Sequence, residues 1–536
     1  MSRLRVTRSV DPATADLLLA PRDDVVGERP APGDGEGDGT RRYVLGDGPF
    51  ERYERIVTAV PDGDGGAATA TVTVTEDIDF RLPPATWRFL LTPAIRTALR
   101  RRPEARRRLP WWYPPQRPDA RAATTLGMLA TLSIVVGYHG TLLTQTMTYA
   151  ASEFGVGTAA QGNAFAAVRV GGLLAIVLGA LADRRGRRAI LTLALVLCIG
   201  STVAGAAAPD LAVLAATQVV NRGAWAAAGV LLAIVAAEEM PAGARAYALS
   251  LLAMTGALGA GIALWLLPLA DRGEGGWRLL YLASLLFVPL VARVAPRIPE
   301  TRRFERVHRT LRLTGHYGRL VLLAVTSLLL NIFVAPQSQF LNEFLREERG
   351  MRAPTISLFV VVTSTPAAIG IVAGGRLADT RGRRVVGATG IVVGTLLTAL
   401  SFTVPGVWMW VTAAVGGIFA AMLIPTITVF GPELFPTALR GRANGIVTTT
   451  AMVGSVLGLV AAGHLRDSLG SFGRTIGLLA VAPLLAAVII LLVFPETARR
   501  ELEDLNPEDR SGPGPPAPAA APIPPAARSG TTPSGG

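Results

Sequence analysis

The sequence predicts an all-α membrane protein with twelve transmembrane helices in two six-helix bundles, and a small extension before the first helix. Three observations support this fold class. The apolar residues fall into long runs, a charged motif occurs twice about 196 residues apart, and two further charged pairs repeat at nearly the same offset. Ordered repeats inside hydrophobic sequence are typical of a duplicated membrane bundle.

The hydrophobic runs define the helices. The chain has 536 residues, of which 50% are hydrophobic and 17% charged, and its mean hydropathy is +0.41. A helix that spans a bilayer needs about 20 apolar residues. Twelve segments meet this requirement: 124–149, 160–181, 188–207, 211–237, 246–270, 277–297, 319–342, 355–377, 385–404, 407–430, 442–464 and 474–494.

The repeats divide these helices into two halves. The main motif reads GALADRRGRR at 179–188 and GRLADTRGRR at 375–384, and each copy lies between two apolar runs. Glu238, Pro241 and Arg245 recur as Glu433, Pro436 and Arg440, and the PET sequence of 299–301 recurs at 495–497. We therefore expect one bundle at 121–297, a basic linker at 298–318, a second bundle at 319–494 and a disordered Pro/Ala-rich tail at 495–536.

The positive charge predicts the orientation. The net charge is +13 and comes entirely from arginine, since the chain contains no lysine. These arginines cluster in the loops that follow the even-numbered helices, as cytoplasmic loops require. We expect a multi-pass plasma-membrane protein with both termini in the cytoplasm and no nucleic-acid partner. The first 20 residues contain no apolar core, so the first transmembrane helix should act as the insertion signal.

Residues 1–120 form the predicted cytoplasmic extension. Residues 22–41 are rich in Gly, Pro and acidic residues and are expected to be disordered. The alternating segments 53–60 and 68–80 predict a β-hairpin, and its Gly-rich turn lacks the later ligands of a calcium loop. A helix starting near Pro84, followed by Trp111, Trp112 and Tyr113, suggests an interfacial segment, with a partner-binding unit as the alternative.

The composition also argues against an enzyme. The single cysteine, Cys198, lies in an apolar run, so the chain offers neither a disulfide nor a metal cluster. No nucleophile–base pair occurs in the membrane segments, and a phosphate-binding loop would need a lysine. We expect no cofactor and no metal. The oligomeric state stays open, and a monomer is compatible with the sequence.

The repeated motifs resemble those of a known family. The loop at 179–188 is similar to the signature loop of the major facilitator superfamily, and the second copy departs from the first at Thr380. Residues 433–442, ELFPTALRGR, and the two PET motifs resemble segments of its sugar and metabolite:proton symporter branch, and Trp277-Arg278 also fits. The resemblance covers roughly 121–500. It implies alternating access around a central cavity, with a small-molecule substrate and protons as partners.

By this resemblance, the charged motifs form a latch that closes the cytoplasmic side when the cavity faces outward. Carboxylates there can pair with arginines and with the positive ends of helices. The alternative, that these charges only set topology, explains the arginines but not the repeated acids. The residues assigned to the latch are Asp183, Arg187, Glu238, Arg245, Glu300, Asp379, Arg383, Glu433, Arg440 and Glu496.

Ionisable residues deep in the bilayer are candidates for function. His139, Arg169 and Arg222 lie about 22, 21 and 24 Å from the cytoplasmic helix ends, at 1.5 Å per residue. Relatives often carry Gly-Tyr/Phe-Asp in the first helix, whereas this chain reads Gly137-Tyr138-His139. The departure leaves the usual proton acceptor in question.

A nearby arginine and burial both disfavour the imidazolium form, so His139 should be neutral in the empty cavity. We hypothesise that an anionic substrate held by the arginines reverses this bias and recruits a proton. The alternatives are an interhelical hydrogen bond for His139 and snorkelling for Arg169.

Polar residues of the first and seventh helices complete the candidate site. Gln145, Asn331 and Gln337 are the preferred further contacts, and the other candidates are Thr141, Thr144, Gln339 and Asn342. Interhelical hydrogen bonding is the alternative for each of them. The favoured function is proton-coupled uptake of a small organic anion. Proton-antiport efflux, sugar transport and a non-transporting nutrient sensor stay open.

Overall fold

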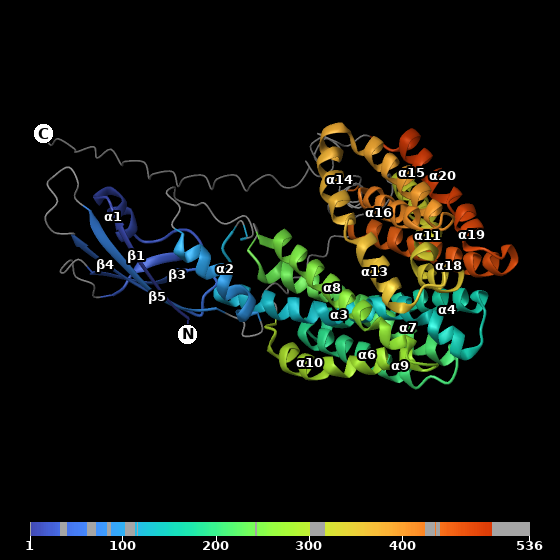
Figure 1. The fold of residues 1–536 in the computed structure, drawn as a ribbon, viewed down its shortest axis with the longest axis horizontal. Helices are drawn as coiled ribbons and strands as arrows, with labels where there is room; N and C mark the ends of the chain where they lie inside the picture. The colour runs from blue at the N-terminus through green and yellow to red at the C-terminus, as the bar shows by residue number, and fades with distance from the viewer. Residues whose placement is uncertain are drawn as a thin grey trace, which may run out of the picture.

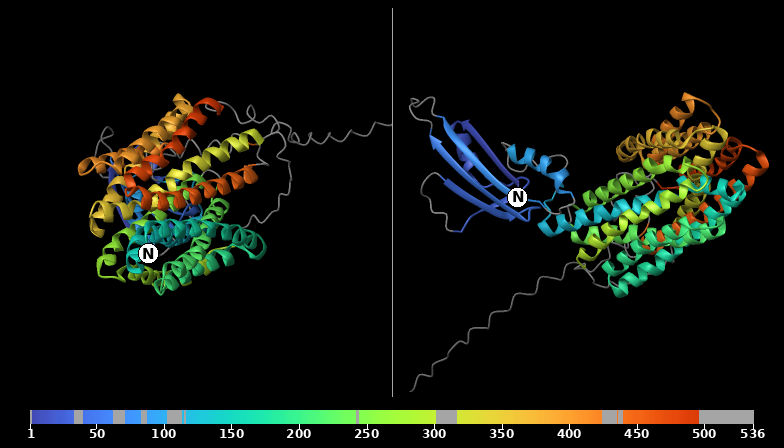
Figure 2. Two further views of the ribbon diagram at one scale, coloured as in Figure 1. Left: turned by 90° about the vertical axis from the view of Figure 1, so that its right-hand side faces the viewer. Right: turned by 60° about the horizontal axis from the view of Figure 1, so that its bottom comes forward.

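The computed structural model describes two parts of the chain, an N-terminal sheet domain and a helical membrane domain (Figure 1). The residues that it describes are 2–32, 40–61, 71–82, 87–101, 113–114, 116–241, 244–300, 317–423, 435 and 440–495. Figures 1 and 2 show the sheet beyond one end of the helices, close to the start of the first of them. This end of the helical domain is called the sheet-side end below.

The N-terminal domain is a five-stranded antiparallel sheet with strand order β1-β5-β4-β3-β2 and two helices. The predicted hairpin is confirmed, because β4 pairs with β5 in antiparallel register. The elements are β1 (Ser2–Val10), α1 (Pro12–Leu19), β2 (Gly27–Pro30), β3 (Thr40–Asp47), β4 (Arg52–Pro61), β5 (Val72–Arg81) and α2 (Arg88–Arg100).

The expected disorder of residues 22–41 is wrong where the structure describes this segment. Val25 and Val26 are buried in the domain core, and β2 pairs with β3. Composition misled the prediction because a few apolar side chains suffice to fix a short edge strand once a sheet exists to receive them. Residues 33–39 lie outside the described part of the chain.

The interfacial segment is also different from the prediction. Helix α2 packs Ile95 and Leu99 into the core of the sheet domain. Tyr113 is buried there too, and its hydroxyl donates to the carbonyl of Val25 at 3.1 Å. Trp111 and Trp112 lie outside the described residues. The helix and Tyr113 therefore belong to a folded domain, although Phe89 is 77% exposed at the start of α2.

The buried ion network of this domain centres on Arg55, whose side chain is fully buried on β4. Its guanidinium reaches Glu28 at 2.8 Å and Glu76 at 2.9 Å, and it also donates to the carbonyls of Leu18 and Ala20. These bonds tie α1 and β2 to the central strands, because a buried charge is stable only when it is paired.

The helical domain confirms the predicted membrane fold. Within the described ranges, eleven helices are long and apolar enough to cross a bilayer, and Val407–Ala421 is a shorter apolar helix. Each of the twelve predicted segments overlaps one of these helices. The predicted segment 407–430 is described only as far as residue 423.

Two bundles follow one another along the chain. The first contains α3 (Ala120–Phe154), α4 (Thr158–Val170), α5 (Leu174–Arg185), α6 (Arg187–Ala206), α7 (Leu211–Glu239), α8 (Arg245–Leu266), α9 (Gly276–Leu282) and α10 (Val288–Val294). The second contains α11 (Tyr317–Gln339), α12 (Leu341–Glu343), α13 (Ala353–Ser364), α14 (Ala367–Arg381), α15 (Arg383–Ser401), α16 (Val407–Ala421), α18 (Arg440–Leu469), α19 (Phe472–Leu479) and α20 (Val481–Val493).

The two bundles meet at the end opposite the sheet, where α4 packs against α18 (Figure 1). A Cβ atom on Gly162 of α4 would lie 2.6 Å from the carbonyl oxygen of Leu459 and 3.2 Å from the Cα of Gly463. Only glycine permits so close an approach of two helices. We call this region, from the end of α3 and the start of α4 to α12 and the end of α18, the closed end.

Replacing Arg55 with Ala should unfold the sheet domain locally, because Glu28 and Glu76 would keep buried charges without their partner. Breaking a buried pair in this way costs about 3–5 kcal/mol. Hydrogen exchange of the full-length protein should show protection of the β4 amides reduced by about a hundredfold or more. The matched control is Arg3→Ala, which removes an exposed pair with Asp79 and should leave protection nearly unchanged. Equal effects of the two variants would contradict the role of Arg55.

Candidate functional site

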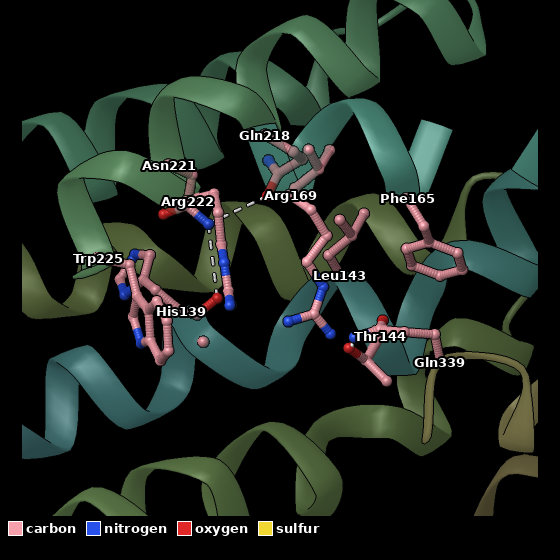
Figure 3. A pocket seen from close by; sticks show the side chains of 12 residues that line it. His139, Leu143, Thr144, Phe165, Arg169, Gln218, Asn221, Arg222, Trp225 and Gln339 are labelled. Atoms are coloured by element: carbon pink, nitrogen blue, oxygen red, sulfur yellow. Dashed lines mark hydrogen bonds between the residues drawn. The ribbon is translucent and has the colours of Figure 1, made fainter. Parts of the chain in front are cut away.

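A cavity in the first bundle brings the three predicted midplane residues together (Figure 3). It lies among α3, α4 and α7, and one residue of α11 completes it. The residues that line it are His139, Gly140, Leu143, Thr144, Phe165, Val168, Arg169, Gln218, Asn221, Arg222, Trp225 and Gln339. His139, Arg169 and Arg222, which were predicted to lie at one depth in the membrane, therefore line one cavity.

One face of α7 supplies four lining residues, Gln218, Asn221, Arg222 and Trp225. Their positions i, i+3, i+4 and i+7 share one side of a helix. The amide of Asn221 donates to Gln218 Oε1 at 3.1 Å and to the carbonyl of His139 at 3.5 Å. Only Arg222 was selected from the sequence. The helical spacing around it was the signal that could have found the other three.

The two arginines give the cavity a positive charge. Arg169 and Arg222 are half-buried, and the Arg222 guanidinium lies 4.3 Å from the centroid of the Trp225 ring. The cavity lining contains no carboxylate, and no ion pair is found for either arginine among the described residues. The site is therefore suited to bind an anion, since buried cations without partners are costly.

The imidazole of His139 is 1% exposed and packs against the rings of Tyr138 and Phe287, with centroid distances of 5.6 and 6.1 Å. Its Nδ1 lies 2.8 Å from the carbonyl oxygen of Val135. A carbonyl only accepts, so Nδ1 carries a proton and Nε2 is left as an acceptor. Nε2 is buried and has no hydrogen-bond partner in the described part of the chain.

The other preferred contacts lie outside this cavity. Gln145 is buried at the closed end, where its side-chain and backbone oxygens accept from the amide of Asn342 at 2.8 Å. Asn331 donates to the carbonyl of Ser327 and accepts from Ser455 of α18 at 3.2 Å, within the second bundle. Gln337 is half-buried and does not line the cavity.

Gln339, which was a secondary candidate, lines the cavity instead. Its Oε1 accepts from the hydroxyl of Thr144 at 2.7 Å, so α3 and α11 are joined across the two bundles. Gln337 and Gln339 are two positions apart in the sequence, which places them on different faces of a helix. The sequence did not show which face of α11 is turned toward α3.

The charged motifs of the first half gather at the sheet-side end. Arg187, the first residue of α6, forms an ion pair with Glu238 at the end of α7. Glu300 accepts from the backbone N–H of Arg187 at 2.6 Å and of Arg188 at 3.5 Å, so its carboxylate caps the start of α6. These contacts lie within the first bundle, and they match the expected pairing of carboxylates with arginines and helix N-termini.

The other latch residues are described in part. Arg245 begins α8 and Arg383 begins α15, the counterpart of α6 in the second bundle. The side chains of Asp183, Asp379 and Arg440 and the whole of Glu433 and Glu496 lie outside the described part of the chain. The latch therefore stays a prediction for both bundles.

The comparisons with known proteins agree with this architecture. The family model described as Major Facilitator Superfamily matches residues 321–528. The structure resembles the xylose transporter XylE from E. coli with a TM-score of 0.61, at 18% identity, over 72% of this chain and 99% of that chain. The family model therefore matches mainly the second bundle, and the likeness in fold extends over both bundles. The named proteins that the chain resembles in fold or in sequence are transporters.

Two further proteins are similar to this chain, one in fold and one in sequence. The nucleoside transporter NupG is similar with a TM-score of 0.58, at 14% identity, over 69% of this chain and the whole of that chain. The cis,cis-muconate transport protein of Acinetobacter baylyi is 24% identical over 253 residues. This match covers 43% of the present chain and 59% of the relative, so the chain spans about three fifths of that protein.

Replacing Glu300 with Ala should loosen the first turn of α6, because two backbone N–H groups lose their acceptor. Loss of such a cap costs about 1 kcal/mol, which corresponds to about a fivefold change in local opening. Hydrogen exchange of residues 187–191 should accelerate by that factor. Glu274→Ala, in an exposed loop elsewhere in the bundle, is the control and should leave these amides unchanged. Unchanged exchange in Glu300→Ala would show that the carboxylate does not cap the helix.

Proposed function

We propose that this transporter carries a small organic anion across the plasma membrane by alternating access, coupled to protons and in the direction of uptake. The observation that supports this proposal best is the pair of arginines, Arg169 and Arg222, in a cavity whose lining contains no carboxylate. Proteins with a similar fold include a xylose transporter and a nucleoside transporter, so the fold alone does not select the substrate.

The electrostatics of the cavity favour an anion. The Arg169 and Arg222 guanidinium groups lie close enough to repel each other. A carboxylate between them removes this repulsion and accepts hydrogen bonds from both, and arginine binds carboxylates in a bidentate manner. The Trp225 ring holds the Arg222 guanidinium in place before a substrate arrives. The site is thus arranged in advance for a negatively charged group.

The partial similarity to the cis,cis-muconate transport protein supports the same substrate class. Muconate is a small dicarboxylate, and two arginines can each bind one of its carboxylates. We therefore expect mono- and dicarboxylates of similar size to be transported in preference to neutral sugars and nucleosides.

The arrangement of the bundles supports alternating access. They pack together at the closed end, where Thr144 bonds to Gln339 and Gln145 to Asn342. The arginine-rich loops and the sheet domain lie at the opposite end, which the positive-inside rule assigns to the cytoplasm. In this orientation both termini are cytoplasmic and the closed end faces outward. The described conformation is then closed to the outside.

Replacing Arg222 with Met should weaken anion binding by about 10- to 100-fold, because a charge-assisted hydrogen bond contributes about 1.5–3 kcal/mol. The measurement is counterflow in proteoliposomes with radiolabelled cis,cis-muconate, benzoate, xylose and uridine. Arg272→Met, an exposed arginine in a loop, is the control and should leave counterflow unchanged. Counterflow of the neutral substrates alone, unaffected by Arg222→Met, would contradict the anion proposal.

Replacing His139 with Ala should abolish accumulation of the anion against its gradient, because the unpartnered Nε2 acceptor is lost. Accumulation driven by an inward pH gradient is the measurement, and counterflow at equal pH on the two sides shows whether the variant still binds substrate. Concentrative, pH-dependent transport by His139→Ala would show that this histidine is not the proton acceptor. Net movement of the anion out of the proteoliposomes in response to the same pH gradient would instead identify an exporter.

A further inference from the structure

A buried carboxyl group lies between the two bundles at the closed end. Glu343 ends the short helix α12, between the spans Tyr317–Gln339 and Ala353–Ile371, and is 1% exposed. This residue was not selected from the sequence, because its neighbours in the chain do not reveal that the first bundle covers it. Neither the latch nor the arginine cavity uses it.

The hydrogen bonds of Glu343 cross the boundary between the bundles. Its Oε1 accepts from the hydroxyl of Thr158, the first residue of α4, at 2.7 Å. Its Oε2 is buried without a hydrogen-bond partner among the described residues, and so is Oε1 of Gln161. Gln161 lies close enough to interact with the Glu343 carboxyl group. Oε2 of Glu343 thus lacks a donor in the described structure, and protonation of the carboxyl group removes the negative charge that this atom would otherwise share without compensation.

The charged groups near Glu343 are engaged elsewhere. Arg466 of α18 forms its ion pair with Glu348 at 3.2 Å. Asp467 of the same helix accepts from the backbone N–H of Ala159 at 3.2 Å.

On the other sides of Glu343, Arg346 lies over the Tyr149 ring of α3 at 4.1 Å, and Glu153 of α3 is paired with Arg278. Glu347, one turn further along, is an exposed carboxylate. Glu343 thus has no ion-pair partner in the described structure.

Burial raises the pKa of Glu343 to about 7 from the ordinary value of 4.5. The Glu347 carboxylate also raises this pKa, while the Thr158 hydroxyl, Arg466 and the Gln161 side chain lower it. The physical reason is that a carboxylate without a cation loses its hydration when the bundles close over it.

The packing around Glu343 excludes water only while the bundles touch. The close approach of Gly162 to Gly463 lies on the same pair of helices, and the rings of Phe165 and Phe340 meet edge to face at a centroid distance of 5.7 Å. Separation of α4 from α18 would break the bond to Thr158 and expose the carboxyl group to water. Glu343 therefore changes its environment at the step that opens this end.

We propose that Glu343 is a proton-binding residue that controls closure of the outer end: its carboxylate takes up a proton from outer water when the bundles part, and the bundles close over the neutral acid. The proton leaves for the cavity, which begins one helical turn away at Gln339 and Phe165. This inference rests on the alternating access of the proposed function. It deepens that proposal by adding a second protonation site to His139, and this second site lies outside the cavity lining.

The test measures closure without a substrate. Spin labels on Ser152→Cys and Ser468→Cys, both exposed at the closed end, report the separation of the bundles in a Cys198→Ser background. In nanodiscs, the open-to-closed ratio should rise by up to tenfold per pH unit between about pH 4.5 and 7, the slope for one proton. It should level off above pH 7, where the closed form is ionised as well.

Glu343→Gln should stay closed from pH 4.5 to 8.5, because glutamine is neutral at every pH. Glu347→Gln, the matched control on the exposed side of the same segment, should keep the slope of the wild-type response, with its upper end moved to lower pH because one nearby negative charge is lost. A flat wild-type profile, or an unchanged profile in Glu343→Gln, would overturn the inference.

Transport separates this inference from the proposed function. Glu343→Gln should reduce accumulation driven by a pH gradient at least tenfold, measured with cis,cis-muconate in proteoliposomes. If the wild type shows no counterflow of the anion panel but its label distances respond to pH, the anion proposal fails and the role of Glu343 stands. If the anion accumulates equally in the wild type and in Glu343→Gln, the role of Glu343 fails and the anion proposal stands.

Discussion

The absence of hydrogen-bonding partners in the hydrocarbon core of a bilayer is the constraint on which this structure depends. Backbone groups meet it by forming helices, and ionisable side chains meet it by lying in a cavity, at helix ends or between the bundles. Arg169 and Arg222 face the cavity, Glu300 caps α6, and Glu343 is enclosed where α4 meets α18. These charged residues are therefore confined to a few places in the fold, because an unpaired charge is costly elsewhere.

The two bundles have corresponding helices at the sheet-side end but contribute unequally to the cavity. Arg187 and Arg383 begin corresponding helices, α6 and α15, after the repeated motif. The cavity, in contrast, is lined almost entirely by α3, α4 and α7 of the first bundle, and the second bundle contributes Gln339. A symmetric frame can rock about a central site, and an asymmetric lining can select a substrate. The single contribution from α11 links the cavity to the closed end, where Glu343 lies one turn further along.

The sheet domain is attached to the membrane domain through Trp87. Its indole N–H lies 2.9 Å from both the carbonyl of Gly127 and the hydroxyl of Thr131 on α3. The domain core is held by packing of α2 on the sheet and by the ion network of Arg55, so it does not depend on the bilayer for its own fold. The first transmembrane helix, which carries His139, is thus tied directly to a folded domain.

The sequence alone determined the twelve helices, their division into two bundles, the repeated charged motifs and the layer of His139, Arg169 and Arg222. These features follow from length, periodicity and helical rise, which are local properties of the chain. Only the tertiary structure decided that Gln339 lines the cavity while Gln337 does not, that the His139 ring packs on Phe287, and that residues 22–41 contribute a strand. It also decided that Glu343 is buried. Burial and pairing depend on which faces of distant segments meet, and no local pattern in the sequence specifies that contact.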